Sequence, residues 1–454
     1  MRDIKEIITP DFIAFIEEHH QDDTKGLILS GKRYPAVNIK AAATIIEARK
    51  KLLKKVPEWG KRYDLYYPAT LAIEQASSVR TALYKQQFIN KGVVIDLTGG
   101  LGIDSYHIAK KAKRIIYIER ESELCAAAEY NFEQLGSNNI EVYNREITPF
   151  NVSSVITEIL SYNIQEEEKQ SIITNDISNN SVSDKYASKR SLNRVDLIYI
   201  DPSRRGTNDR RIFAISDCEP DITKLNEHLF DFTDKILVKV SPMADITLLL
   251  KELPDICTLH ILSVENECKE LLLLLTQGNS NNSGIPIGNS ADTEQAMVEI
   301  SCINFTKQDG IQSFTFTYDH ERLAEPEYAE HLGSYLYEPN SSILKGGAFK
   351  TISSRFEIAK LEKSTHLYTS DNIIEGFPGK VFKIKEVLDY NAKTIRNLNK
   401  IYPKANISVR NFPLSVNELK KRAAIEDGGN IQLMGTTILN NGISLRKIIM
   451  CERI

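Results

Sequence analysis

One stretch, residues 93–120, limits the fold of this chain more than any other: it reads VVIDLTGGLGIDSYHIAKKAKRIIYIER. An apolar run ends in Asp96, a glycine-rich turn and a segment with helical spacing follow, and a second apolar run ends in Glu119. This order predicts a strand–turn–helix–strand unit in which an acidic residue closes each strand. An open α/β sheet holds a nucleotide-type cofactor at such a place, so the stretch predicts a cofactor site.

The glycines and acids of this unit narrow the class of cofactor. Glycine at the first turn lets the backbone approach a ligand and allows a positive φ without a Cβ penalty. The acid ending the second strand is placed to accept hydrogen bonds from two ribose hydroxyls. A dinucleotide fold prefers G-x-G-x-x-G, which seats a pyrophosphate, whereas this turn reads G-G-x-G after Asp96. A carboxylate there suits a cationic amino group, which S-adenosylmethionine (AdoMet) carries without any phosphate.

The string D-L-T-G-G-L-G-I-D at 96–104 resembles motif I of class I AdoMet-dependent methyltransferases. The resemblance implies that Glu119 holds the ribose and that the methionine portion is surrounded by Asp96, Gly99, Gly100, Gly102 and Asp104. It also implies an acid or amide after the third strand that reads the adenine amino group, with Glu146 as the candidate and Asn144 as the runner-up. The alternative is a buried strand and tight turn that bind nothing.

Length and composition set the broad class. A single core stops growing at about 250–300 residues, so a chain of 454 residues is expected to hold several domains. Apolar runs of about 18 residues and a signal-peptide core are both missing, so we expect no membrane span and a cytoplasmic protein. The six cysteines lack C-x-x-C pairing, so we expect reduced thiols and no metal. With a net charge of −4, any nucleic acid must be met by local basic patches.

The pattern along the chain divides it into four parts: a helical region (1–85), an α/β core (86–305), a connecting region (306–380) and a small α+β module (381–454). Core strands are expected at 93–96, 115–119, 140–143, 196–200, 236–240, 258–264 and 298–304. The likeness to methyltransferases makes this a seven-stranded mixed sheet whose last two strands form an antiparallel hairpin. Two low-complexity stretches, about 163–192 and 277–295, are expected to be mobile surface loops.

The C-terminal module has its own pattern of elements. Strands are expected at 380–384, 407–409, 431–438 and 445–451, and helices at 391–402 and 416–424. Asn440-Asn441-Gly442 predicts the turn between the last two strands. The helices carry many basic residues, which suit phosphates. The alternative is an ordinary solvated helix face.

A second motif, D-L-I-Y-I-D-P-S-R-R-G at 196–206, ends another apolar strand in Asp201 and breaks it with Pro202. It resembles the D/N-P-P-Y/F motif of enzymes that methylate exocyclic amines of bases. That resemblance implies that the Asp201 carboxylate and the Pro202 carbonyl accept hydrogen bonds from the amine and align its lone pair. The chain departs from the motif because Ser203 stands for the second proline and Arg204 for the aromatic residue.

The departures change what the substrate side can do. Arg204 and Arg205 are expected to stack on a base or to grip phosphate. Lys239, which ends a later strand, is expected to border the substrate pocket. A cysteine nucleophile is disfavoured: Cys268 is the only candidate near an expected strand end, and its acidic neighbours tend to raise its pKa.

Most of the chain is similar to a group of bacterial, Bacteroidetes-type class I methyltransferases with a THUMP-like C-terminal domain. The strings that carry this likeness, besides those above, include E-Q-A-S-S at 74–78, K-V-S-P-M at 239–243, N-E-C-K-E at 266–270, Y-E-P-N at 337–340, T-H-L-Y-T-S-D at 365–371 and S-V-R-N-F-P at 408–413. It implies an N-terminal helical segment, a Rossmann-like core, a ferredoxin-like insert and a THUMP-like module.

THUMP domains in other enzymes bind structured RNA. The resemblance and the second motif together predict metal-free, direct SN2 transfer of a methyl group from AdoMet to a base nitrogen of tRNA or rRNA. Two alternatives stay open: a small-molecule or protein methyltransferase on the same fold, and a non-catalytic AdoMet- or RNA-binding protein.

Overall fold

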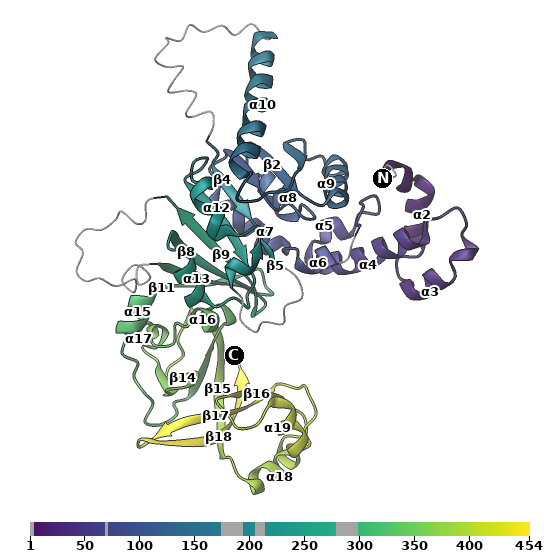
Figure 1. The fold of residues 1–454 in the computed structure, drawn as a ribbon. Helices are drawn as coiled ribbons and strands as arrows, with labels where there is room; N and C mark the ends of the chain where they lie inside the picture. The colour runs from purple at the N-terminus through teal and green to yellow at the C-terminus, as the bar shows by residue number, and fades with distance from the viewer. Residues whose placement is uncertain (1–3, 69–70, 174–193, 205–213, 278–297) are drawn as a thin grey trace, which may run out of the picture. The chain divides into compact units, whose positions relative to one another are not determined.

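The structure is a computed structural model that describes residues 4–68, 71–173, 194–204, 214–277 and 298–454. The chain divides into two compact units, Met1–Cys257 with Leu272–Ile285, and Thr258–Leu271 with Pro286–Ile454. Figure 1 follows the elements along the chain. Across these described ranges, the helices are too short or too polar to pass through a lipid bilayer.

The N-terminal part is helical, as its spacing predicts. Its elements are α1 (Ile4–Ile7), α2 (Pro10–Glu18), α3 (Thr24–Leu29), η1 (Gly31–Arg33), α4 (Ile39–Lys55), α5 (Pro57–Gly60), α6 (Leu71–Gln75), α7 (Val79–Tyr84) and η2 (Lys85–Phe88). The longest, α4, begins where the Asn38 side chain accepts from the Ala41 amide. It buries a stripe that includes Ala42, Ile46 and Leu52. The Asn131 side chain of α9 (Ser122–Gln134) pairs with both backbone groups of Tyr66, which fixes this part to the α/β core.

Parallel strands in the order β7-β4-β1-β2-β3 form the centre of the first unit. They are β1 (Val93–Asp96), β2 (Arg114–Glu119), β3 (Ile140–Asn144), β4 (Leu197–Ile200) and β7 (Lys235–Val240). The helices that alternate with them are α8 (Ile103–Ala109), α9 (Ser122–Gln134), α10 (Val152–Ile173), α12 (Ile222–Leu229) and α13 (Ile246–Glu252). A short pair, β5 (Ser203–Arg204) and β6 (Cys218–Glu219), follows β4, and η3 (Ile215–Asp217) precedes β6. The residues of β1, β2, β4 and β7 are almost all buried and, apart from Lys239 and the strand-end acids, mostly apolar, as parallel strands require, whereas the edge strand β3 is half-buried.

The remaining strands correct one expectation. The sheet is mixed but has nine strands rather than seven. Four further strands, in the order β11-β10-β8-β9, extend it on the side of β7. These are β8 (Ile256–Val264), β9 (Glu267–Thr276), β10 (Glu299–Phe305) and β11 (Ile311–Thr317). The expected antiparallel hairpin of 258–264 and 298–304 is wrong, because β8 and β10 pair in parallel. A two-residue turn, Glu265 and Asn266 at positive φ, instead joins β8 to β9, which the sequence reading missed.

The low-complexity stretches also differ in part from expectation. The beginning of 163–192 is not a loop, since α10 continues to Ile173. Its run Q-E-E-E-K-Q consists of good helix formers, which explains the continuation. The rest of that stretch and nearly all of 277–295 lie outside the described residues.

The second unit contains a seven-stranded sheet in the order β13-β14-β12-β15-β18-β17-β16. Its strands are β12 (Tyr335–Pro339), β13 (Ala359–Glu362), β14 (Thr365–Ser370), β15 (Gly379–Asp389), β16 (Asn406–Arg410), β17 (Ile431–Asn440) and β18 (Ile443–Arg453). Its helices are α15 (Tyr318–Leu323), α16 (Ser341–Gly346), α17 (Thr351–Phe356), α18 (Ala392–Ile401) and α19 (Val416–Ala423).

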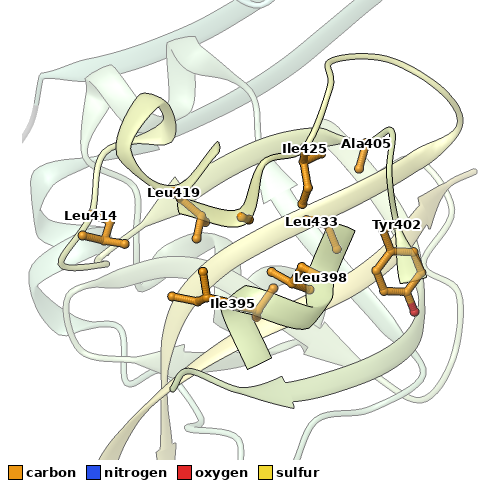
Figure 2. Packing of buried hydrophobic residues seen from close by; sticks show 10 residues of the cluster. Ile395, Leu398, Tyr402, Ala405, Leu414, Leu419, Ile425 and Leu433 are labelled. Atoms are coloured by element: carbon orange, nitrogen blue, oxygen red, sulfur yellow. The ribbon is translucent and has the colours of Figure 1, made fainter. Parts of the chain in front are cut away.

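The strands and helices predicted for the C-terminal module are confirmed. Asn441 and Gly442, both at positive φ, form the turn between β17 and β18. Buried side chains from α18, α19 and the sheet pack into one core, with Leu398, Leu419 and Leu433 at its centre (Figure 2). Because α18 buries Ile395 and Leu398 on one side, its basic residues are left on the other.

Candidate functional site

A cleft of about 420 Å³ lies at the carboxyl ends of β1, β2, β4 and β7 in the first unit. Ligands of open α/β sheets bind at this end of the strands. The cleft brings together segments that are far apart in the sequence: 75–77, 96–104, 119–121 with Leu124, Arg145 and Ile147, Tyr199, Asp201 and Ser203, Glu219 and Pro220, and Lys239. Both motifs found in the sequence therefore contribute to one cavity.

The glycine loop 99–102 owes two of its glycines to the fold itself. A Cβ at Gly99 would lie 2.0 Å from the Tyr117 ring, and one at Gly102 would lie 2.4 Å from the Phe132 ring. Gly100 has φ +59° and meets nothing closer than 3.9 Å. The sequence reading assigned these glycines to close approach of a ligand, whereas for Gly99 and Gly102 the requirement comes from the aromatic residues behind the loop.

Glu119 ends β2 with its carboxylate at the cleft. Its Oε2 accepts from the Gly100 amide at 2.7 Å, and its Oε1 accepts from the Glu121 amide at 2.8 Å. A carboxylate oxygen can accept two hydrogen bonds, so each oxygen keeps one acceptor position. The side chain of Glu119 thus fits a pair of neighbouring hydroxyl groups, such as those of a ribose.

Asp96 also lines the cleft, but its carboxylate is engaged inside the protein. It accepts from the Thr98 amide at 3.0 Å and from the Ser105 hydroxyl at 2.6 Å. Burial raises the pKa of Asp96 to about 7, although both hydrogen bonds oppose the rise. Asp96 therefore shapes the turn that follows β1.

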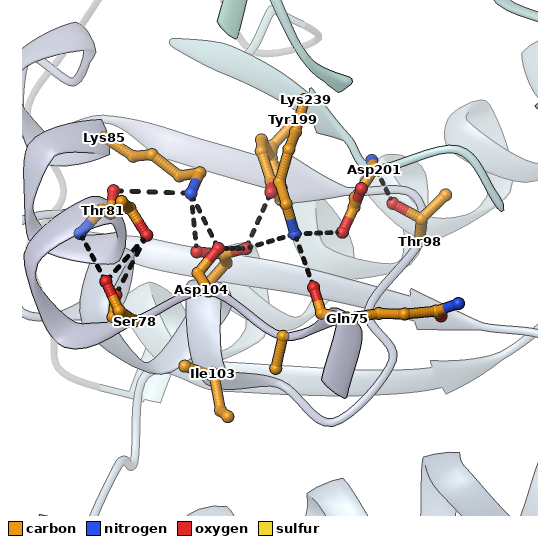
Figure 3. A network of polar contacts seen from close by, with 12 residues as sticks. Gln75, Ser78, Thr81, Lys85, Thr98, Ile103, Asp104, Tyr199, Asp201 and Lys239 are labelled. Carbon is orange, nitrogen blue, oxygen red and sulfur yellow. Dashed lines mark hydrogen bonds and ion pairs between the residues drawn. The ribbon is translucent and has the colours of Figure 1, made fainter. Parts of the chain in front are cut away.

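A polar network lies between β1, β4, β7 and the N-terminal helices (Figure 3). The Asp104 carboxylate forms an ion pair with the Lys85 ammonium at 3.0 Å. It also accepts hydrogen bonds from the Tyr199 hydroxyl at 2.8 Å and the Ser77 hydroxyl at 2.9 Å. Burial alone would raise the pKa of Asp104, but the charges of Lys85 and Lys239 together hold it well below its usual range. The network therefore keeps a buried anion at the first turn of α8.

Asp201 follows β4 at the edge of the same network. Its amide donates to the Thr98 hydroxyl at 2.6 Å, and its Oδ2 accepts from the Lys239 ammonium at 2.5 Å. The side chain keeps 35% of its exposure. Desolvation raises the pKa of Asp201, and the ion pair with Lys239 opposes this without cancelling it. Asp201 is thus the carboxylate of the network that a ligand can reach.

The charges around the cleft suit a cationic ligand. Acidic lining residues outnumber basic ones: Asp96, Asp104, Glu119, Glu121, Asp201 and Glu219 stand against Arg120, Arg145 and Lys239. A pyrophosphate would meet mostly like charge there, whereas a sulfonium with an amino group would meet opposite charge. The residues present therefore fit AdoMet better than a dinucleotide.

The other expected site residues are placed less uniformly. Ser203 lines the cleft, and Pro202 is half-buried beside Asp201 but outside the lining. The backbone of Arg204 pairs with Cys218, and Arg205 lies outside the described residues. Arg145 and Ile147 line the cleft, while Glu146 between them does not. The Asn144 amide group donates to the carbonyls of Glu119 and Arg120 instead.

Sequence reasoning missed several cleft and network residues. Gln75, Ser77 and Tyr199 line the cleft, and Lys85 stands directly behind it. The string E-Q-A-S-S offered a signal for the first two, because it stood among the strings shared with the resembling group. Nothing in the local pattern marked Lys85, which is 0% exposed.

The cysteines and the acidic side chains can be compared with the cleft only over the residues that the structure describes. No cysteine is among its lining residues, and burial raises the pKa of the Cys268 thiol to about 11. Within the described ranges, no group of three or more histidine, cysteine, aspartate or glutamate side chains is arranged to hold a metal ion.

Comparison with known proteins bears on the fold and the family. Family models match residues 335–378 as a ferredoxin-like domain and residues 379–453 as a THUMP domain-like region. A protein from Porphyromonas gingivalis W83, described as a methyltransferase, is 32% identical, with a TM-score of 0.80 over 100% of this chain and 99% of its own. The chain belongs to this family. It is a class I AdoMet-dependent methyltransferase family of the Bacteroidetes type with a THUMP-like C-terminal domain.

Other solved structures resemble this family member only in part. An AdoMet-dependent methyltransferase from Aquifex aeolicus is 14% identical over 43% of this chain and 89% of its own, with a TM-score of 0.26. An rRNA methylase from Streptococcus thermophilus is 10% identical over 44% and 95%, with a TM-score of 0.28. Likenesses at this level do not bear on function. No curated protein matches the sequence.

Proposed function

We propose that this chain transfers the methyl group of AdoMet to a base nitrogen of structured RNA, either tRNA or rRNA, by direct SN2 displacement. One observation carries the proposal: Asp201 and Ser203, on either side of Pro202, line the same cleft as Glu119 and the glycine loop. A methyl donor held by the loop and an amine held by the turn would therefore meet in one cavity.

The donor side rests on Glu119 and the acidic lining. Glu119 would accept from the two ribose hydroxyls with the acceptor positions that its backbone contacts leave. Asp96, which lines the cleft and also accepts hydrogen bonds within the turn, would lie beside the methionine portion. When bound, AdoMet supplies a methyl group on a positively charged sulfur, which makes that carbon open to attack.

The acceptor side rests on Asp201 and Pro202. The Asp201 carboxylate, held through Oδ2 by Lys239, can accept an N–H hydrogen bond from an exocyclic amine with its other oxygen. The Pro202 carbonyl would accept the second N–H, which turns the nitrogen lone pair toward the methyl carbon. The N–C bond forms as the S–C bond breaks, and the excess proton on nitrogen leaves through Asp201 to solvent. Alignment of the reacting atoms would supply most of the rate.

The RNA side rests on the C-terminal module. Lys393, Arg396 and Lys400 are exposed on α18, at spacings that place them on one face, opposite buried Ile395 and Leu398. Such a row of cations suits a phosphate backbone, since each contact releases counterions. Arg410 and Lys420, also basic, are instead paired with Glu338 and Asp427.

The test is incubation of the purified protein with labelled AdoMet and total RNA, followed by identification of the modified nucleoside. Asp201→Ala should lose at least about 100-fold in transfer, because the amine loses its alignment. Calorimetry should show that the variant still binds AdoMet, and the exposed Asp231→Ala should behave as wild type. Label that appears only in protein or small molecules, or no AdoMet uptake by the wild type, would contradict the proposal.

A further inference from the structure

The Lys239 ammonium stands between two carboxylates. It lies 2.5 Å from Asp201 Oδ2 and 3.7 Å from Asp104 Oδ2, and it also donates to the Gln75 carbonyl at 3.4 Å (Figure 3). The nearer partner, Asp201, is the more exposed of the two, with 35% of its side chain accessible against 11% for Asp104. A buried anion needs a counter-charge more than a partly hydrated one does. If Asp104 had no other cation beside it, the Lys239 ammonium would therefore be expected to pair with Asp104 rather than with Asp201.

A second lysine, Lys85, supplies the cation that Asp104 needs. Lys85 is fully buried in η2, and its ammonium lies 3.0 Å from Asp104 Oδ1 and 3.0 Å from the Ser77 hydroxyl. The Ser77 and Tyr199 hydroxyls donate to the other oxygen of Asp104. The charge of Asp104 is thus balanced by Lys85 from the N-terminal helices. The Lys239 ammonium can therefore pair with Asp201.

We infer that Lys85 is a positioning residue of the acceptor site: by neutralising Asp104 it holds Lys239 on Asp201, and so keeps the Asp201 carboxylate ionised and aimed into the cleft. This rests on the proposed function, in which Asp201 receives the amine. Lys85 itself is not among the cleft-lining residues, so it acts on Asp201 from behind the cleft, directly through its charge and indirectly through Asp104 and Lys239.

The inference predicts a pH effect. The charged and titratable groups that face Lys239 are Asp104 on α8, Asp201 after β4, Tyr199 on β4 and Lys85 on η2, with Asp96 behind them on β1. If Lys239 moves to Asp104, Asp201 loses its nearest cation and its proton is held more tightly. As the pH falls, the Asp201 carboxylate that accepts the amine then becomes protonated at a higher pH than in the wild type.

The test compares the pH profile of methyl transfer, at saturating AdoMet, for the wild type, Lys85→Met and the double variant Lys85→Met/Asp104→Asn. We expect the acid limb of Lys85→Met to move up by about one pH unit, which corresponds to a tenfold loss of transfer on that limb. In the double variant Asp104 no longer competes for Lys239, so the limb should return to its wild-type position, whatever the maximal rate. A residue with a merely structural role would not be rescued in this way.

Two further variants complete the design. Lys85→Gln, which keeps hydrogen bonds to Asp104 and Ser77, should shift the limb in the same direction by less, and it serves if Lys85→Met does not fold. Lys110→Met removes a partly exposed lysine that pairs with Glu58, and it should leave the profile unchanged. An unshifted limb in both Lys85 variants, or a shifted limb in the double variant, would overturn the inference.

Crystal structures separate this inference from the proposed function. In Lys85→Met the Lys239 ammonium should contact Asp104 and leave Asp201, and in the double variant it should contact Asp201 again. If the wild type methylates no RNA, the proposed function fails while these positions still decide the role of Lys85. Lys239 remaining on Asp201 in Lys85→Met would sink the inference even if RNA is methylated.

Discussion

At the scale of single residues, the two carboxylates that end the neighbouring strands β1 and β2 differ in how deeply they are buried. Each carboxylate oxygen of Glu119 and of Asp96 accepts one hydrogen bond from the protein, but Glu119 keeps 8% of its exposure and Asp96 only 1%. The sequence gives both acids the same appearance, at the end of an apolar run. Only the fold shows that Asp96 is the more deeply buried of the two.

The burial of Asp96 has a consequence for stability. Its pKa is raised from 3.8 to about 7, so between these values the native state holds the proton more tightly than the unfolded chain does. Asp96 therefore makes the protein less stable as the pH rises through this window. Asp96→Asn should remove that contribution, so the unfolding free energy of the variant relative to wild type should increase by about 2–3 kcal/mol between pH 5 and pH 7.

Urea unfolding at both pH values measures this difference. Asp231→Asn, at an exposed position, controls for the loss of one negative charge. A relative unfolding free energy of Asp96→Asn that stays level or decreases over the window would show that Asp96 does not hold its proton in the native state.

At the scale of elements, the glycine loop is shaped from behind by β2 and α9. Gly102 and Gly136 have similar backbone angles, with φ of 78° and 71°. They differ in space, because a Cβ at Gly102 would lie 2.4 Å from the Phe132 ring, while one at Gly136 would meet nothing within 4 Å. This pair separates the strain of the backbone from the crowding by the ring.

Gly136→Ala should cost about 1–2 kcal/mol of unfolding free energy, the penalty for a side chain in the left-handed region. Gly102→Ala should cost about 1–3 kcal/mol more, since Phe132 must also move. Chemical denaturation of both variants gives the two values. Equal costs would mean that Phe132 yields without resistance and that packing does not fix the loop.

At the scale of the whole molecule, the charge pattern predicts how RNA binding depends on salt. Replacing Lys393, Arg396 and Lys400 together with alanine should reduce the slope of log K against log salt by about 2–3, since each phosphate contact adds about 0.7–0.9. Filter binding to total tRNA measures the slope, at salt concentrations from about 50 to about 200 mM, the range over which phosphate contacts weaken strongly. A triple variant at exposed Lys25, Lys40 and Lys54 of the N-terminal helices should keep the wild-type slope. The same slope in both triple variants would place the RNA elsewhere on the protein.

The sequence predicted the elements best where pattern and turn chemistry agreed. β1, β2, β4 and β7 follow from apolar runs that end in polar residues, and β17 and β18 follow from the turn at Asn441 and Gly442. The reading failed at β9, because Glu265 and Asn266 make a two-residue turn without a glycine, so no glycine marked it.

The site was predicted less completely than the fold. Strand-end acids are visible as local patterns, so the sequence predicts Glu119 and Asp201 at the sheet edge where the cleft lies. Lys85 could not, because a lysine on a short helical turn reads as exposed unless its partner is known. That partner, Asp104, comes from another element, and only the folded chain brings the two together.

The pairing of Lys85 with Asp104 joins the N-terminal helices to the α/β core across the boundary that the sequence suggested at residue 85. A core excised from residue 86 onward would lose the nearer cation of Asp104 and keep only Lys239, 3.7 Å away. The same constraint applies to recombination between relatives. Lys85 and Asp104 have to be exchanged together, because a segment that carries only one of them would bring a charge without its counter-ion. Breakpoints before Ser77 or after Lys239 leave this group of side chains in one block.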